Sequence, residues 1–217
     1  MDLHEALYTT RAMRRLKPDP IPLDVQARIL DAAIRAPHVG EAWRFILVDD
    51  AGLRLTLGTL YEQAFLGFLA NMGVPDVEMA MQGDGPMAQA LRSGVHLARN
   101  FHTVPLLLIG YAQTDGSGIY PALWSAMLAA RAEGVGSTLT GMLHSFHASE
   151  VNDLLGVPSG EGWNMHGVVA MGYPRGRWGL ARRKPVDAVA ARNGWTGELG
   201  LTVPEPLWQE PAGTEPG

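Results

Sequence analysis

The sequence contains no cysteine. This absence excludes disulfide bonds, thiolate metal sites, iron–sulfur ligation and a cysteine nucleophile. The N-terminus, MDLHEALYTT, also lacks the basic start and apolar run of a signal peptide. Together these two features lead us to expect a cytoplasmic protein.

Long hydrophobic runs and an excess of positive charge are missing as well. No stretch approaches the roughly 20 apolar residues that a membrane-spanning helix needs. The chain has 17 Lys and Arg against 22 Asp and Glu, which gives a formal net charge of −5. Such a chain has no overall basic field to attract nucleic acid or an anionic membrane, so we expect neither as a partner.

Several motifs of catalysis and binding are absent. The sequence has no GxSxG nucleophile elbow, no GxxxxGK[ST] phosphate loop and no GxGxxG dinucleotide fingerprint. Its seven histidines include no HExxH pair. His144 and His147 lie three residues apart, and their spacing favours polar surface or core positions over a ligand pair. We therefore expect no metal site.

The hydrophobic pattern that is present predicts helices and strands in alternation. Helical spacing covers residues 2 to about 9, 24 to 35, 52 to 71, 87 to 100 and 120 to 134. Buried strands are predicted at residues 43 to 48, 104 to 112 and 166 to 174. Because the order lacks a strict β-α-β rhythm, we expect an α+β fold with a mixed sheet and helices on the outside.

The clearest helical stripe begins at Tyr120, just before Pro121, and ends before Gly134. Its members recur at helical spacing: Tyr120, Leu123, Trp124, Met127, Leu128 and Arg131. We expect most of this face, Trp124 included, to lie in the core.

One domain is expected for residues 1–200, with a flexible C-terminal tail at residues 201–217, where the composition is rich in proline and supports little periodic structure. The arginine- and proline-rich segment after residue 174 is expected to lie over a neighbouring surface, such as that of a second protomer. Glycine, proline and methionine interrupt any steady period in residues 72 to 91, which predicts a mobile apolar cover.

Two basic clusters lie near opposite ends of the chain. The first comprises Arg11, Arg14 and Arg15, and the second comprises Arg182, Arg183 and Lys184. Arginine suits phosphate because its planar guanidinium group offers charge-assisted donors in a fork. Composition alone also allows the alternative that both clusters are solvated and balance the acidic excess.

Four segments resemble the FMN-dependent nitroreductase family, in the order and spacing of that family, from about Leu3 to Trp195. They are TTRAMRRLKPDPIP, ILDAAIRAPHVGEAWRFILV, YPALWSAMLAARAEGVGSTLT and GYPRGRWGLARRKPVDAV. The resemblance implies a nitroreductase-like α+β fold, with a mixed sheet flanked by helices. It also implies an intertwined homodimer with FMN at the interface, in which the C-terminal extension of each chain lies over the partner.

The resemblance further implies how the phosphate of FMN is held. Arg11, Ala12 and Arg14 match the N-terminal phosphate motif of the family. Arg183 matches a second phosphate-binding arginine near the C-terminus, with its neighbour Arg182 as the alternative position.

Two other matches concern the flavin ring. Leu139, Thr140 and Gly141 match the segment whose backbone N–H lies against the reactive edge of the flavin, where a glycine permits close approach. The loop formed by residues 36 to 40 matches the one that borders the isoalloxazine ring, and its contacts fall on Ala36, Pro37 and His38.

In this family the flavin carries the chemistry, so no side chain is needed as catalytic acid, base or nucleophile. The resemblance implies that NADPH or NADH delivers hydride to flavin N5 and leaves before an acceptor binds. We therefore expect an oxidoreductase acting on nitroaromatics, quinones or related conjugated acceptors. Two alternatives stay open: a flavin destructase, whose loop APHVG resembles, and a flavin-binding or sensor protein without turnover.

The sequence also departs from the family pattern. The loop before Trp43 is short and carries Glu41 where a neutral amide is usual, and Trp124 and Ser125 stand where many relatives have Gln-Asn. These changes put two polar flavin contacts in question. The methionine-rich segment from residue 72 to residue 87 is predicted to shape the acceptor pocket, because methionine adapts to flat apolar ligands.

Overall fold

The computed structural model describes residues 1–38, 42–74, 76–113, 115–181, 183–203 and 205–209. The chain forms two compact units. The larger unit comprises Ala12–Gly176, and the smaller unit combines Met1–Arg11 with Arg177–Gly217. The division into a domain at residues 1–200 and a tail at residues 201–217 stays a prediction.

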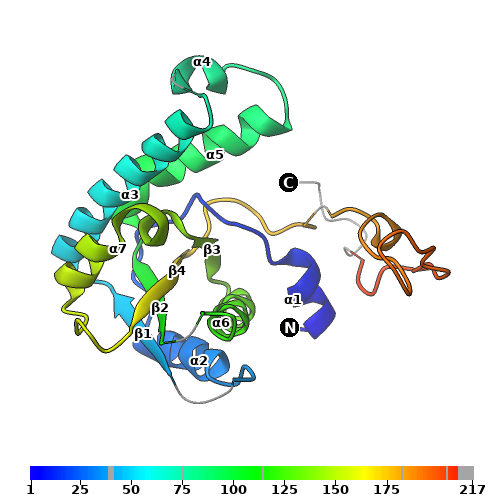
Figure 1. Cartoon of the computed structure of the whole chain (residues 1–217), viewed down its shortest axis with the longest axis horizontal. Helices are drawn as coiled ribbons and strands as arrows, with labels where there is room; N and C mark the ends of the chain where they lie inside the picture. The colour runs from blue at the N-terminus through cyan, green and yellow to red at the C-terminus, as the bar shows by residue number, and fades with distance from the viewer. Residues whose placement is uncertain (39–41, 75, 114, 182, 204, 210–217) are drawn as a thin grey trace. The chain divides into compact units, whose positions relative to one another are not determined.

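The larger unit is built on a four-stranded sheet in the order β1-β2-β4-β3 (Figure 1). The strands are β1 (Trp43–Val48), β2 (Leu106–Ala112), β3 (Gly136–Thr140) and β4 (Asn164–Gly172). All three pairings are antiparallel, and a parallel bridge joins Ala12 to Ser137 of β3. Together with the surrounding helices, this sheet confirms the predicted α+β fold.

Helices cover both faces of the sheet (Figure 1). One face carries α2 (Leu23–Ala33) and α6 (Ile119–Ala132). The other side carries α3 (Ala51–Asn71), α5 (Pro86–Asn100), the short turn η1 (Phe101–Thr103) and α7 (Met142–Leu155). The short helix α4 (Val77–Met81) lies between α3 and α5 in the chain, within the predicted apolar cover.

The central strand β2 is buried along its whole length. Leu106 and Leu108 belong to a core cluster that includes Ile29 of α2 and Leu123 of α6. This burial is what the continuous apolar run predicted, because a strand between two helical layers exposes neither face to water. The burial of these side chains supplies the main apolar stabilisation of the unit.

The buried face of α6 contains Leu123, Met127 and Arg131 of the predicted stripe. Its other members are Ile119, Ala122, Ala126 and Ala130, which the predicted stripe did not include. Tyr120 and Trp124 are instead 43% and 39% exposed, so the core position expected for Trp124 is wrong. The reason is close packing: a Cβ at Gly110 of β2 would lie only 3.1 Å from Ile119 and 3.2 Å from Leu123. Gly110 on β2 and the alanines on α6 allow this approach, whereas Tyr120 and Trp124 remain outside the buried face.

The sequence pattern did not predict β3 or α7. Leu139 and Thr140 end β3, and Gly141 is the N-cap of α7. β3 is short and rich in small polar residues, so it gave no hydrophobic alternation. α7 is interrupted at His147, whose φ of −137° and ψ of 31° are not helical, and its apolar residues therefore form no single stripe.

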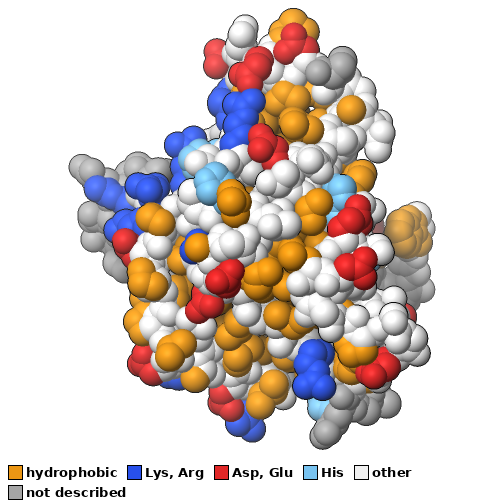
Figure 2. Space-filling view, turned by 90° about the vertical axis from the view of Figure 1, so that its left-hand side faces the viewer, with side chains coloured by type: hydrophobic (Ala, Val, Ile, Leu, Met, Phe, Trp, Pro, Cys, Tyr) orange, Lys and Arg blue, Asp and Glu red, His pale blue; other side chains and the backbone are white. Residues whose placement is uncertain are grey.

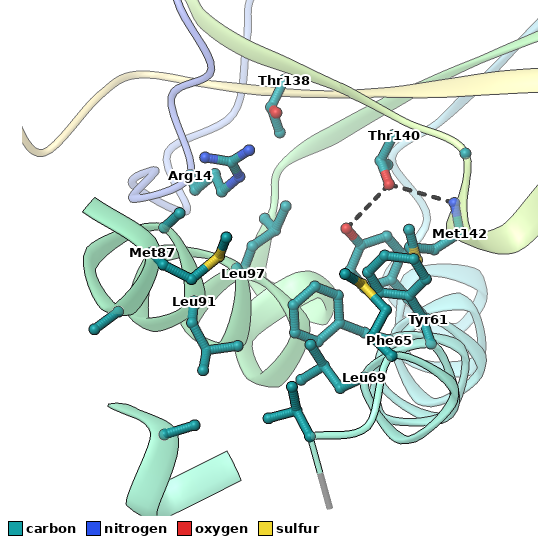
Figure 3. Close-up of a pocket in the computed structure, with 18 of the residues that line it drawn as sticks. Arg14, Tyr61, Phe65, Leu69, Met87, Leu91, Leu97, Thr138, Thr140 and Met142 are labelled. Carbon is teal, nitrogen blue, oxygen red and sulfur yellow. Dashed lines mark hydrogen bonds between the residues drawn. The ribbon is translucent and has the colours of Figure 1, made fainter. Parts of the chain in front are cut away.

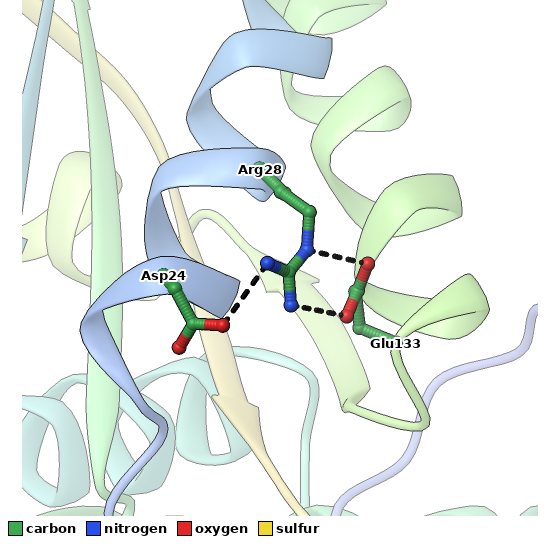
Figure 4. A network of polar contacts seen from close by, with 3 residues as sticks. All are labelled: Asp24, Arg28 and Glu133. Atoms are coloured by element: carbon green, nitrogen blue, oxygen red, sulfur yellow. Dashed lines mark hydrogen bonds and ion pairs between the residues drawn. The ribbon is translucent and has the colours of Figure 1, made fainter.

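Arg28 connects α2 to the end of α6 (Figure 4). Its Nε and Nη2 donate to the two carboxylate oxygens of Glu133, each at 2.9 Å, and its Nη1 donates to Asp24 at 3.0 Å. These bonds lower the pKa of the Glu133 and Asp24 carboxyl groups. Because water screens all three charges, the network orients the two helices more than it stabilises them.

The face of the larger unit that carries α3 and α7 has hydrophobic side chains exposed between charged ones (Figure 2). Leu55 and Leu66 of α3 are 61% and 42% exposed, and Phe146 of α7 is 38% exposed. No helix in the described part of the chain is both long enough and apolar enough to span a membrane.

The smaller unit joins α1 (Leu3–Thr9) to the C-terminal segment, which contains the turn η2 (Val186–Ala188). The carbonyl of Tyr8 accepts the N–H of Ala181 at 2.9 Å, and its hydroxyl accepts the N–H of Leu207 at 3.0 Å. Arg11 Nη2 donates to the carbonyl of Arg177 at 3.0 Å. Residues 204 and 210–217 of the predicted tail lie outside the described residues.

Gly58→Ala is expected to destabilise the larger unit. A Cβ at this position of α3 would lie 2.8 Å from His102 Cβ and 3.0 Å from the His102 backbone nitrogen, so η1 must shift to accommodate it. We expect a loss of about 1–3 kcal/mol in the free energy of unfolding, measured by urea denaturation at a fixed protein concentration.

Gly67→Ala is the matched control in the same helix. No atom of another described residue lies within 4 Å of the new Cβ, so only helix propensity changes. We expect a gain of up to about 1 kcal/mol. Equal losses in the two variants would contradict the close contact between α3 and η1.

Candidate functional site

A cavity of about 510 Å³ opens between α3, α5 and the end of β3 (Figure 3). Most of its walls are apolar side chains of the two helices, including Tyr61, Phe65, Leu69, Met87, Leu91 and Leu97. Its volume and lining are typical of a site for a small organic ligand.

Tyr61 fixes the wall of the cavity nearest β3. Its ring stacks on Phe101 with centroids 3.9 Å apart and planes at 7°. Its hydroxyl lies 3.1 Å from Thr140 Oγ1, which also accepts the N–H of Met142 at 3.4 Å (Figure 3). Burial raises the pKa of the Tyr61 hydroxyl, so this group stays neutral. The contacts hold α3 against the strand end that borders the cavity.

Arg14 supplies the positive charge of the cavity. It lines the wall together with Thr138 (Figure 3). Its guanidinium group makes no hydrogen bond or ion pair with another described residue. An uncompensated guanidinium beside an apolar cavity is suited to bind an anionic part of a ligand.

Gly141 presents bare backbone to the cavity. Its φ of −106° and ψ of 4° are open to any residue. A Cβ there would meet only Ser145 Oγ, at 4.0 Å. The fold itself therefore does not demand glycine here, and the missing side chain leaves room for a flat ligand to approach the backbone.

The structure brings part of the predicted site together. Arg14, Leu139, Thr140 and Gly141 all line the cavity. The assignment of these residues to a flavin stays a prediction.

The predicted flavin loop does not line this cavity. Ala36 is buried just after α2, and the exposed His38 ring packs against Trp43 with centroids 4.7 Å apart. Pro37, between them, is exposed, and Glu41 lies outside the described residues.

The other residues predicted to contact the phosphate do not line this cavity in the described part of the chain. Ala12 is exposed and bridges to Ser137 in the larger unit. Arg11 belongs to the smaller unit, as does Arg183, which lines a separate cavity of about 750 Å³ within that unit. Arg182 lies outside the described residues.

Sequence reasoning missed most of the apolar wall. A stripe at helical spacing on α3 and its C-cap lines the cavity: Tyr61, Phe65, Phe68, Leu69 and Met72. That spacing was a usable signal for a common face, but it does not separate a cavity wall from packed core. The methionine-rich segment does contribute, through Met72 and Met87, whereas the side chain of Met79 is 66% exposed and does not belong to the lining.

The described residues include no group of three or more His, Asp or Glu side chains that could hold a metal ion. His147, one of the two closely spaced histidines, instead pairs with Glu150, with Nδ1 3.0 Å from Oε1. The other of these histidines, His144, lies beside His166, and the centroids of the two rings are 6.1 Å apart.

Residues 7–173 match the model of the nitroreductase family. This match spans most of the chain, including both helices of the cavity and β3, and the protein therefore belongs to the nitroreductase family. The resemblance found in the four sequence segments is confirmed.

Individual proteins are also similar to this chain. An NADH dehydrogenase from Thermus thermophilus is 26% identical over 204 residues, which cover 87% of this chain and 95% of the relative. The crystal structure of an oxidized iodotyrosine deiodinase bound to FMN and 3-iodo-L-tyrosine has a TM-score of 0.70 at 20% identity, covering 89% of this chain and 100% of the other. The FMN-dependent nitroreductase NfnB from Mycobacterium smegmatis in complex with NADPH has a TM-score of 0.60 at 20% identity, covering 80% and 90%. At these identities the two structures establish the shared fold.

Tyr61→Phe is expected to destabilise the protein by about 0.5–1.5 kcal/mol, because it removes the hydroxyl that pairs with Thr140 while keeping the stack on Phe101. Urea denaturation at a fixed protein concentration measures the change.

Tyr111→Phe is the matched control. Tyr111 is 1% exposed, burial raises its pKa to about 12, and its hydroxyl has no hydrogen-bond partner among the described residues. Removing this hydroxyl is expected to leave stability unchanged or to raise it. If both substitutions lowered the free energy of unfolding equally, the hydrogen bond between Tyr61 and Thr140 would not be what holds this wall.

Proposed function

We propose that this protein is an FMN-dependent oxidoreductase that accepts hydride from NADPH or NADH and reduces nitroaromatics, quinones or related conjugated acceptors. The observation that carries the proposal is the cavity of a nitroreductase-family chain that combines Arg14, the open backbone at Gly141 and apolar walls. FMN has a phosphate, a reactive ring edge and a flat apolar body. The residues present fit these three parts.

The residues of this chain would then act by binding and positioning. Arg14 holds the phosphate, with Arg11 and Arg183 as the further contacts that the family resemblance implies. The backbone at Gly141 approaches the ring edge, and Tyr61 keeps the neighbouring Thr140 in place. When bound, FMN supplies hydride transfer at N5.

The apolar walls would exclude water from the reacting partners. A single cavity bordered by the same helices supports alternate occupation by donor and acceptor, and therefore ping-pong kinetics. No side chain of the described lining is needed as acid, base or nucleophile.

We also propose a homodimer with the flavin at the interface. Ala36, Pro37 and His38 do not line the cavity of their own chain, and in a dimer they would border the flavin of a second copy. The C-terminal extension of the smaller unit would lie over that partner. A cytoplasmic location stays a prediction.

The proposal is tested by absorption spectroscopy of the purified protein after incubation with FMN and removal of the excess. We expect a retained flavin band that NADPH or NADH bleaches without oxygen and that an added quinone restores. Sustained turnover would exclude a sensor. Failure to retain flavin would contradict the proposal, and oxygen-dependent destruction of the chromophore would favour the flavin destructase.

Arg14→Ala is expected to weaken FMN binding by at least about tenfold, which corresponds to the loss of one hydrogen bond to a charged group. Fluorescence titration of the apoprotein with FMN measures the dissociation constant. Arg35→Ala is the control, because Arg35 pairs with Asp31 on α2 and does not line the cavity. Equal FMN affinity in the two variants would remove Arg14 from the phosphate site.

Neutral acceptors are expected to be preferred over anionic ones. Arg14 is the single charged residue in the described lining, and the proposed function commits it to phosphate. Methyl 4-nitrobenzoate and 4-nitrobenzoate share a nitroaromatic ring and differ in charge. We expect kcat/KM to favour the ester by at least about tenfold, because the carboxylate would enter apolar walls unpaired.

Leu91→Arg tests the same preference from the protein side. Leu91 is partly buried in the α5 wall, and an arginine there offers the carboxylate a partner. The preference for the ester is expected to shrink or reverse. If the unaltered protein reduced 4-nitrobenzoate and its methyl ester with equal kcat/KM, this result would contradict the apolar character of the acceptor site.

A further inference from the structure

A second concave surface adjoins the cavity along the first turns of α5. This groove of about 540 Å³ is lined by Arg14, Arg15, Pro86, Gln89, Ala90, Arg92 and Ser93. Arg14 and Ala90 line both the groove and the cavity, so a ligand can extend from one into the other.

The groove concentrates positive charge. Its described lining contains three guanidinium groups and no carboxylate. Arg14 and Arg15 form no hydrogen bond or ion pair through their side chains with other described residues. Arg92 is fixed in place, because its Nη1 donates to the carbonyls of Met81 at 2.6 Å and Gly83 at 2.8 Å. Its Nε and Nη2 have no partner among the described residues and remain able to donate.

Elsewhere in the larger unit, several arginines are neutralised by carboxylates. Arg28 pairs with Asp24 and Glu133, Arg35 with Asp31, and Arg99 with Glu78. The groove is therefore a place where positive charge is left uncompensated. His96 is affected by the same field: burial lowers the pKa of its imidazole, and the charges of Arg15 and Arg175 lower it further.

Neutral donors accompany the arginines. Gln89, Arg92 and Ser93 follow i, i+3 and i+4 spacing and therefore share one face of α5. A planar guanidinium fork matches the terminal oxygens of a phosphate monoester, and amide and hydroxyl groups add hydrogen bonds to the same oxygens. The lining of the groove therefore offers charged and neutral donors of the kind that bind a phosphate monoester.

We propose that this groove binds the 2′-phosphate of NADPH and makes NADPH the preferred hydride donor. The inference rests on the proposed function, since the nicotinamide ring must enter the cavity while the remainder of the dinucleotide extends out of it. Arg15 and Arg92 then contact the phosphate that NADH lacks. A phosphate monoester carries up to about two negative charges, more than either phosphate of the dinucleotide's pyrophosphate bridge, and it matches the two guanidinium groups best.

Nucleotide binding tests the proposal without any need for flavin chemistry. Calorimetric titration of the protein with adenosine 2′,5′-bisphosphate and with 5′-AMP compares ligands that differ in the 2′-phosphate. We expect the bisphosphate to bind at least about tenfold more tightly. Arg15→Gln and Ser93→Asp are expected to abolish most of this difference. Arg99→Gln, on the same helix but outside the groove, is expected to retain it.

Kinetics provide the second measurement. In the FMN-loaded protein, Arg15→Gln is expected to lower kcat/KM for NADPH by at least about tenfold while leaving that for NADH nearly unchanged. Indistinguishable binding of the two nucleotides would overturn the proposal, as would an unaltered NADPH preference in Arg15→Gln. Weaker FMN binding in that variant, with an unchanged ratio of the two donors, would assign the groove to the flavin phosphate instead.

The two proposals fail in different ways. A protein that retains no FMN but still discriminates the two adenosine nucleotides would contradict the proposed function and keep the groove as a 2′-phosphate site. If the protein oxidised NADH and NADPH equally well and bound the two adenosine nucleotides equally tightly, the proposed function would be supported. The assignment of the groove as a 2′-phosphate site would then be wrong.

Discussion

The cavity depends on the way α3 is anchored in its first half. At Gly58 the helix lies so close to η1 that a methyl group has no room. One turn later Tyr61 stacks on Phe101 and bonds to the end of β3. A further turn along, the Phe65 ring occupies the space beside Gly94, where a Cβ would lie 2.6 Å from Phe65 Cζ. These successive contacts hold α3 against η1, β3 and α5 in turn, and the side chains beyond them face an opening.

Charge is distributed in a way that complements this packing. The exposed arginines Arg28, Arg35 and Arg99 are paired with carboxylates, so they add little net field near the molecule. The N-terminal segment that bridges to β3 carries Arg14 and Arg15, and α5 brings Arg92 to the same groove. An overall acidic chain thus keeps a local region of positive potential beside an apolar cavity. That arrangement suits ligands that have a flat ring at one end and phosphate at the other.

Much of the fold was readable in the sequence because it rests on strong periodic signals. β1 was predicted at its observed bounds, and β2, α3 and α5 were placed within a few residues. The buried face of α6 was predicted only in part, because large side chains dominate a sequence pattern, whereas Gly110 and the alanines decide how close the helix can lie. β3 and α7 were missed because one lacks alternation and the other is broken at His147.

The site was predictable only where a short motif marked it. Arg14 and the segment at Gly141 were found through the family resemblance, and the structure places both on one cavity. Most of the apolar wall was not found, since a stripe such as Tyr61, Phe65 and Leu69 is equally consistent with packed core. Whether two stripes meet or leave a space between them depends on contacts such as Gly58 with His102, which join residues far apart in the sequence.

The methionines at the cavity give the site a particular chemical vulnerability. Met72 and Met87 are 60% and 78% exposed, and both belong to the apolar lining. The chain has no cysteine that could react first with an oxidant. Thioether sulfur is therefore the most readily oxidised atom of the wall, and each sulfoxide replaces a soft apolar surface with a strong dipole. The same flexible side chains that let the wall adapt to flat ligands make its polarity sensitive to peroxide.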